Sequence, residues 1–117
     1  MGHVHTATIN KVVLAIPPVS SGQSFVGASL PPYGVVSIGT ELAHRFPNLQ
    51  IEVWDGVVLG QPELLKRAKS LEQSVLFGIS AHTSLNYSNC LELVRAAPKA
   101  NVVLGGIHVF ARRCGRL

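Results

Sequence analysis

The order of apolar and polar residues along this chain predicts short strands that alternate with helices. Apolar runs of strand length lie at 12–16, 51–55, 75–79 and 101–104, and stretches with apolar residues at helical spacing separate them. The run at 75–79 has no polar face, which is typical of a strand covered on both sides of a sheet. The run at 51–55 partly alternates, which indicates a strand nearer an edge. Strands that alternate with helices predict a parallel sheet with right-handed crossovers.

Prolines and capping residues predict where these elements begin and end. Pro17-Pro18 ends the first strand, because proline cannot continue the ladder of backbone hydrogen bonds. Helices are expected at 33–46, from Gln61 onward, and from a cap at Ser84 or Asn86 onward. The expected fold is α/β and Rossmann-like (flavodoxin-like), a three-layer αβα sandwich with about four parallel strands.

The expected domain organisation is a flexible N-terminal lead, 1–10, followed by one domain, 11–117. A fifth strand and a closing helix usually complete such a fold, and neither is predicted after Gly106, so we expect a C-terminally incomplete domain. A long loop, 17–34, lies at the carboxyl end of the first strand. Loops of this length are usually functional or disordered, and its position at the ligand-binding edge of a parallel sheet favours function.

The composition limits the partners. The chain is 47% hydrophobic and 14% charged, whereas an ordinary soluble domain is about 25% charged, so either both sheet faces are buried or part of the surface meets a partner. No apolar run approaches the roughly 18 residues that span a bilayer, and no secretory signal is evident, so we expect a cytoplasmic protein without a membrane partner. The net charge is +4, but no aromatic residues are interleaved among the basic ones, so we expect no nucleic-acid partner.

The residues with catalytic potential form no known constellation. GxGxxG, GxxxxGK[ST] and GxSxG are absent, no acidic cluster follows the first strand, and Asp55 is expected to form a turn or a cap. Cys90 and Cys114 lack CxxC spacing, so two free thiols are expected. His82 and His108 follow strand ends, where each is either a ligand or proton donor or an ordinary polar loop residue.

Gly105-Gly106 closes the fourth strand and leaves two interpretations open. Glycine tolerates positive φ, so the pair can form a tight turn. Alternatively, a bulky ligand approaches the backbone where a Cβ would collide.

An ordered set of short motifs carries a family resemblance. These are KVVLAIPP at 11–18, PYG at 32–34, VWD at 53–55, FGIS at 77–80 followed by Thr83, and VLGGIH at 103–108. Over about residues 11–110 the chain resembles the N-terminal cobalamin-binding domain of cobalamin-dependent radical-SAM enzymes.

The resemblance implies that a Rossmann-like sheet holds cobalamin (vitamin B12) at the carboxyl ends of its strands. The nucleotide tail would run beside 78–80 and 105–106, with Ser80 and Thr83 hydrogen-bonded to it, and the loop 17–34 would lie under the corrin. The implied cofactor-binding residues are Pro18, Gly34, Gly78, Ser80, His82, Thr83, Gly105, Gly106 and His108.

Two motifs of the wider families are absent. Without DxHxxG the lower ligand of the cobalt, and hence the metal site, remains unassigned. Without CxxxCxxC the chain is expected to hold no iron–sulfur cluster and to be no enzyme on its own. The implied role is a binding module that serves a radical-SAM or methyl-transfer domain or a partner chain.

Two alternatives come from the residues themselves. A degenerate Rossmann-like interaction domain would bind no cofactor and would associate, as a homo-oligomer or with another chain, through its uncovered sheet edge. A flavodoxin-like protein would bind a flavin phosphate through Ser20, Ser21 and Ser24.

Overall fold

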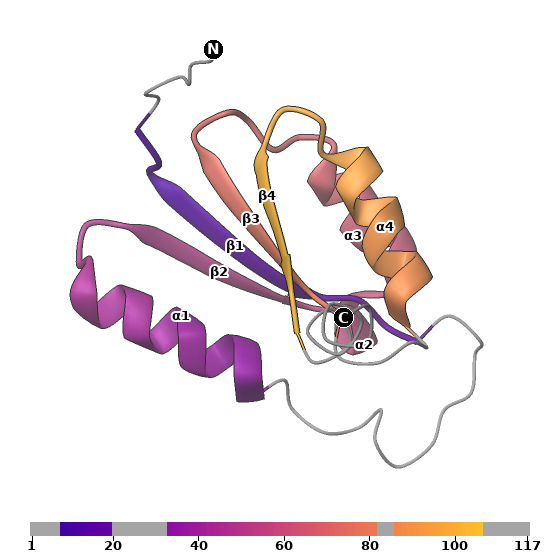
Figure 1. Ribbon diagram of the computed structural model, residues 1–117, viewed down its shortest axis with the longest axis horizontal. Coiled ribbons are helices and arrows are strands. Elements are labelled where there is room, and N and C mark those ends of the chain that lie inside the picture. The colour runs from indigo at the N-terminus through magenta and orange to yellow at the C-terminus, as the bar shows by residue number, and fades with distance from the viewer. Residues whose placement is uncertain (1–7, 20–32, 82–85, 107–117) are drawn as a thin grey trace, which may run out of the picture.

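The computed structural model describes residues 8–19, 33–81 and 86–106, and they form an α/β fold of three layers (Figure 1). The elements follow the expected alternation of strands and helices. In chain order they are β1 (Lys11–Ile16), α1 (Tyr33–Arg45), β2 (Gln50–Asp55), α2 (Gly56–Leu59), α3 (Gln61–Ala68), β3 (Val75–Ser80), α4 (Tyr87–Ala96) and β4 (Asn101–Gly105).

Within these described residues the sheet has four parallel strands in the order β2-β1-β3-β4. The fold class expected from the sequence is therefore confirmed, and so is the edge position of β2. The backbone of Asn10 extends the pairing on both sides of β1, since its N–H donates to Ser74 and its carbonyl accepts from Gln50. All four carboxyl ends lie at one edge of the sheet, which is where parallel sheets bind ligands.

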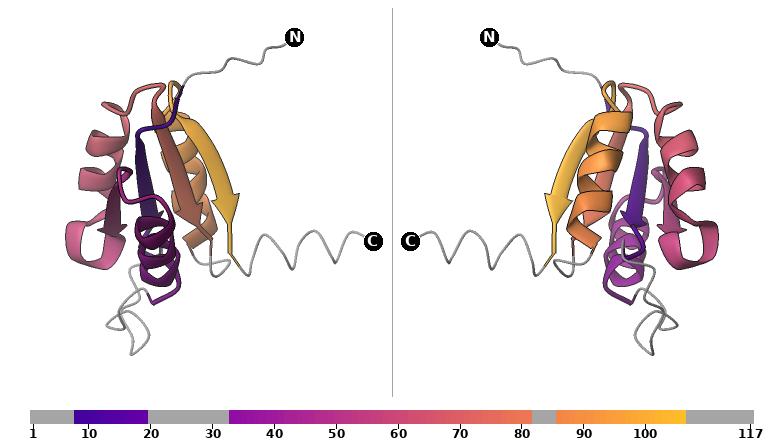
Figure 2. Two further views of the ribbon diagram at one scale, coloured as in Figure 1. Left: turned by 90° about the vertical axis from the view of Figure 1, so that its left-hand side faces the viewer. Right: turned by 90° about the vertical axis from the view of Figure 1, so that its right-hand side faces the viewer.

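The larger part of the core lies between the sheet and the helices α3 and α4. These two helices pack against each other on one face of the sheet, and α1 lies on the other face (Figure 1 and Figure 2). Phe77 in β3 is fully buried there and meets the Trp54 ring edge-on, with 5.5 Å between ring centroids. Leu64 of α3 and Leu93 of α4 are equally inaccessible to solvent. This face is a conventional close-packed core.

The opposite face is only partly covered by the described residues. Helix α1 packs over β1 and β2, where Val12, Leu14 and Val35 form a smaller cluster. The prediction of a third strand covered on both sides was therefore wrong for this face. Leu76 and Gly78 of β3 are half-buried, and Val103 of β4 is 55% exposed, because α1 does not extend over them.

The region after β2 also differs from the sequence prediction. A turn was expected at Asp55-Gly56, with Asp55 as a turn or cap residue. Asp55 is a cap, since its carboxylate accepts a 3.0 Å hydrogen bond from the Val57 N–H, but it caps a four-residue helix, α2, that was not predicted. No helix in the described part of the chain has the length and apolarity needed to cross a membrane.

Candidate functional site

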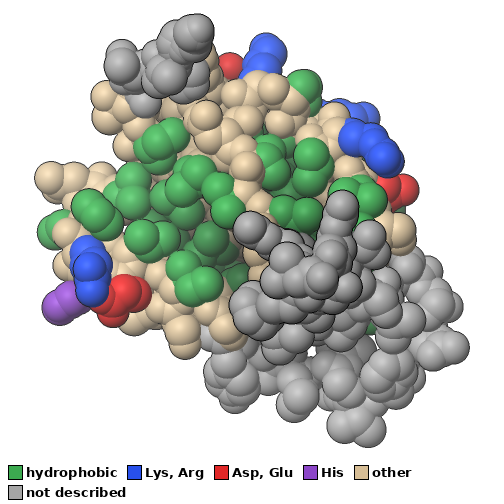
Figure 3. Space-filling view, viewed as in Figure 1, with side chains coloured by type: hydrophobic (Ala, Val, Ile, Leu, Met, Phe, Trp, Pro, Cys, Tyr) green, Lys and Arg blue, Asp and Glu red, His purple; other side chains and the backbone are tan. Residues whose placement is uncertain are grey.

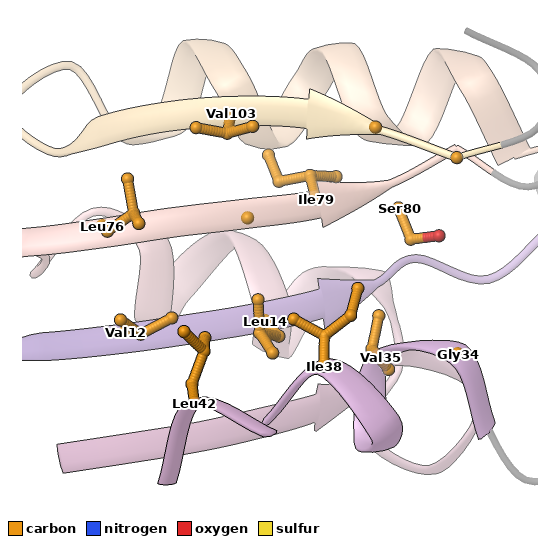
Figure 4. A pocket seen from close by; sticks show the side chains of 13 residues that line it. Val12, Leu14, Gly34, Val35, Ile38, Leu42, Leu76, Ile79, Ser80 and Val103 are labelled. Atoms are coloured by element: carbon orange, nitrogen blue, oxygen red, sulfur yellow. The ribbon is translucent and has the colours of Figure 1, made fainter. Parts of the chain in front are cut away.

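An apolar groove runs along the partly covered face, between α1 and the strands β1, β3 and β4. Its volume is about 490 Å³ and its lining is almost wholly apolar. The side chains of α1 point toward the strands across it (Figure 4), and hydrophobic side chains gather over this face with charged ones at its rim (Figure 3). We call this feature the open groove; its walls are Val12, Leu14, Val35, Ile38, Leu42, Leu76 and Val103.

One end of the open groove opens at the carboxyl edge of the sheet. Here the lining changes from branched apolar side chains to glycines and one hydroxyl. We call this end the groove mouth, which consists of Gly34, Ser80, Gly105 and Gly106. Gly78 lies one side-chain position further in, on the same face of β3 as Ser80. The open groove thus combines an apolar interior with a small, partly polar entrance.

The glycines of the open groove face different surroundings. A Cβ on Gly34 or Gly105 would have no neighbouring atom within 4 Å among the described residues. A Cβ on Gly78 would lie 2.9 Å from a methyl group of Leu14, at the end of a flexible side chain. Gly106 has φ +110° and a Cβ there would lie 2.7 Å from the Ala81 carbonyl oxygen. Only Gly106 is therefore required by the backbone itself.

Two asparagines at the start of α4 donate hydrogen bonds to backbone carbonyls at the carboxyl edge of the sheet. The Asn86 amide is fully buried and donates to the carbonyls of Pro17, at 3.1 Å, and Ser80, at 3.2 Å. Asn89 donates to the Pro18 carbonyl at 2.9 Å. The sequence predicted Asn86 as a possible cap; it occupies the N-cap position, but its side chain makes no capping bond and instead ties strand ends together.

The buried thiol of Cys90 lies near the same Ser80 carbonyl that accepts from Asn86. The sulfur of Cys90 lies 3.5 Å from the Ser80 carbonyl oxygen, and burial raises its pKa from 9.0 to about 12. The thiolate is the reactive form of cysteine, so Cys90 remains a neutral, structural thiol at physiological pH. Within residues 8–19, 33–81 and 86–106, no group of three or more His, Cys, Asp or Glu is placed to hold a metal ion.

The structure brings together five of the nine residues implied by the resemblance. Gly34, Gly78, Ser80, Gly105 and Gly106 all line the open groove.

The remaining four lie elsewhere. Pro18 is outside the groove lining, against Gly56, where it would lie 2.6 Å from a Cβ on that glycine. His82, Thr83 and His108 lie outside the described residues.

The sequence analysis did not predict the role of two groups of residues at this site. The α1 wall, Val35, Ile38 and Leu42, was predicted as a helix face, but nothing in its spacing distinguishes a groove wall from a core contact. The asparagines at 86 and 89 were visible as polar residues one helical turn apart, and that spacing places both on one side of α4. This signal indicates a shared role near the strand ends.

Comparison with known proteins adds no relative. No protein-family model, curated protein or solved structure matches this chain.

Proposed function

We propose that this chain is a cobalamin-binding module that holds the corrinoid at the carboxyl edge of the sheet and its nucleotide tail in the open groove. The observation that carries the proposal is the gathering of Gly34, Gly78, Ser80, Gly105 and Gly106 around one groove. These residues come from separate motifs of the family resemblance, spaced over about 70 residues of chain. A shared ligand would explain why Gly34 and Gly105 are small, since no described residue crowds either of them.

The chemistry of the open groove fits a nucleotide tail that ends in a flat, largely apolar base. Val12, Leu14 and Leu76 offer an apolar floor for such a base. The Ser80 hydroxyl at the groove mouth can donate to or accept from the ribose and phosphate. A volume of about 490 Å³ falls within the roughly 300–1,000 Å³ of small-molecule sites.

The glycines at the groove mouth provide a test of fit that needs no bound ligand. Gly34 and Gly105 have negative or extended φ and open space where a Cβ would stand. No described protein atom therefore requires glycine there, whereas a bulky ligand lying on the backbone would. Among the described residues no cobalt ligand is identified, and when bound the corrinoid would supply methyl transfer or radical chemistry to a partner domain.

The test is a visible absorption titration of the purified chain with hydroxocobalamin. A saturable change toward the base-off spectrum is the expected result. Gly105→Val, which points a branched side chain into the groove mouth beside Ser80, should raise Kd at least about tenfold, or about 1.4 kcal/mol. Ala43→Val, an exposed site on α1 away from the lining, is the matched control. An unchanged spectrum with a chain that is folded by circular dichroism would contradict the proposal.

A second candidate function is association through the sheet edge at β4. The five residues of β4 carry no charged side chain, and none of them is fully buried. The other edge strand, β2, is protected by Glu52 and Asp55. Charges at an edge normally discourage pairing with another chain, so of the two edges that the described strands form, β4 is the one open to a partner. Sedimentation velocity without ligand tests this function, with a rise in sedimentation coefficient with concentration as the expected result.

A further inference from the structure

Asn86 ties together the ends of two strands that border the groove mouth. Its amide nitrogen donates to Pro17, just after β1, and to Ser80, the last residue of β3. The residue is 0% exposed, and hydrogen bonds in such surroundings are costly to lose because the carbonyls cannot turn to water. One planar NH₂ group with two donors is the chemical requirement, and among uncharged side chains only those of asparagine and glutamine carry it.

The peptide between Ser80 and Ala81 is held at both of its polar groups. Its carbonyl accepts from Asn86 at 3.2 Å and lies 3.5 Å from the Cys90 sulfur. Its N–H donates to the Gly105 carbonyl at 2.7 Å. A peptide is planar and rigid, so fixing both groups fixes the direction in which the Ser80 side chain leaves the backbone. That side chain lies at the groove mouth (Figure 4).

We propose that Asn86 is a positioning residue for the ligand: through the Ser80–Ala81 peptide it aims the Ser80 hydroxyl and the Gly105–Gly106 backbone at the groove mouth. The inference rests on the proposed cobalamin function for its ligand, but the geometry behind it is independent of that function. Preorganised polar groups of this kind increase affinity because they need no ordering on binding.

The path of the chain after β1 supports the same role. Asn89 donates to the Pro18 carbonyl, and Gly56 leaves room for Pro18, since a Cβ on Gly56 would lie 2.6 Å from the Pro18 ring. The Pro17–Pro18 segment is thereby anchored against α4 and α2, away from the open groove. Pro18 thus belongs to the support of the site, as a partner of the asparagines, instead of contacting the ligand.

A ligand-independent measurement tests the fixed peptide. In Asn86→Ala, amide hydrogen exchange at Ala81 should accelerate at least about tenfold, because the peptide loses the anchor on its carbonyl side. Asn101→Ala is the matched control: its amide also bridges two carbonyls, Gln73 at 2.8 Å and Val75 at 3.4 Å, but at the opposite edge of the sheet. Exchange at Ala81 should remain within about twofold of wild type in that control. Equal acceleration in both variants would overturn the proposal.

A double-mutant cycle with hydroxocobalamin tests the route through Ser80. Asn86→Ala alone should raise Kd about tenfold, and the same change in a Ser80→Ala background should raise it less than about threefold, because the hydroxyl to be aimed is gone. Additive effects would overturn the positioning role. If the wild-type chain binds no hydroxocobalamin, the cobalamin function fails, while the exchange measurement still decides the role of Asn86.

A buried asparagine can also be needed for folding. Asn86→Ser, which keeps one donor for one of the two carbonyls, replaces Asn86→Ala if that variant does not fold. If neither variant folds, Asn86 is a requirement of the whole domain and the positioning role is overturned.

Discussion

Gly105 and Gly106 are neighbours at the end of β4, but the structure constrains them differently. Gly106 has φ +110° and its missing Cβ would lie 2.7 Å from backbone. Gly105 has neither constraint. The backbone therefore requires glycine at position 106, whereas Gly105 borders open space among the described residues, and stability measurements can separate the two cases.

Gly106→Ala should lower the free energy of unfolding by about 1–3 kcal/mol, because a side chain is forced into a disfavoured backbone conformation against the Ala81 carbonyl. Gly105→Ala should stay within about 1 kcal/mol of wild type, since alanine is favoured over glycine in a strand interior. Urea unfolding followed by circular dichroism measures both. Equal losses would show that Gly105 has a structural role that its surroundings do not reveal.

Cys90 provides a prediction about reactivity. Burial raises its pKa from 9.0 to about 12, so in Cys114→Ser the remaining thiol should not react with a disulfide reagent at pH 8 until the chain is unfolded by urea. Because the folded pKa is raised, the stabilising contribution is complete below about pH 9 and is lost as the pH rises toward 12. Cys90→Ala should lack this alkaline loss. Rapid labelling of the native chain at pH 8 would contradict the prediction.

At the scale of single elements, a charged pair joins β1 and β2 on the sheet face that packs against α3 and α4. The Lys11 ammonium lies 2.9 Å from the Glu52 carboxylate, which also accepts from the Trp54 indole at 3.0 Å. The hydrogen bond from Lys11, followed by that from Trp54, lowers the pKa of Glu52 below 4.5. The carboxylate is partly exposed, at 37%, so solvent weakens the pair.

Acid should weaken the β1–β2 connection. Since the folded pKa of Glu52 is lowered, its contribution is present above about pH 4.5 and is lost as the pH falls through the folded pKa. Glu52→Gln should therefore reduce the loss of unfolding free energy between about pH 5 and pH 3. Glu72→Gln, an exposed change beyond α3, is the control. Identical acid profiles for wild type and Glu52→Gln would rule out this role.

The elements themselves were largely predictable from the sequence, for local reasons. Each strand is a short apolar run, and each long helix has a proline or a capping residue near its start or end, as at Pro47 after α1 and Pro62 in α3. The short helix α2 was not predicted, because Asp-Gly is a strong turn signal and a four-residue helix has no periodicity to detect. The role of Asn86 depends on Pro17, 69 residues away in sequence, which no local pattern can encode.

At the scale of the whole molecule, the layer arrangement determines where the open groove lies. Motifs at strand ends identified its mouth, because parallel strands bring their carboxyl ends together whatever the sequence between them. Its walls were not identified, since Val35, Ile38 and Leu42 differ from core residues only in what faces them. An apolar run predicts burial, but it does not predict whether the chain itself, a ligand or a partner provides the cover.

A substitution at the exposed Val103 can distinguish a bound ligand from a second copy of the chain as the group that covers this apolar face. Val103 is 55% exposed on the edge strand β4 and lines the open groove, while Val58, on α2, is 77% exposed and lies outside the lining. Both valines are surface residues, so substitution of either by lysine should change the free energy of unfolding by less than about 0.5 kcal/mol. If copies of the chain pair through β4, Val103→Lys should weaken concentration-dependent association at least about fivefold, because charges at an edge disfavour pairing.

Val58→Lys should leave that association unchanged, and sedimentation velocity measures both variants. Hydroxocobalamin connects this result to the proposed function. A ligand in the open groove covers the same face, so binding should compete with any association that buries Val103. Association that falls equally in both variants would indicate a general charge effect. If association persists in Val103→Lys and is unchanged by hydroxocobalamin, the interface lies on another part of the molecule.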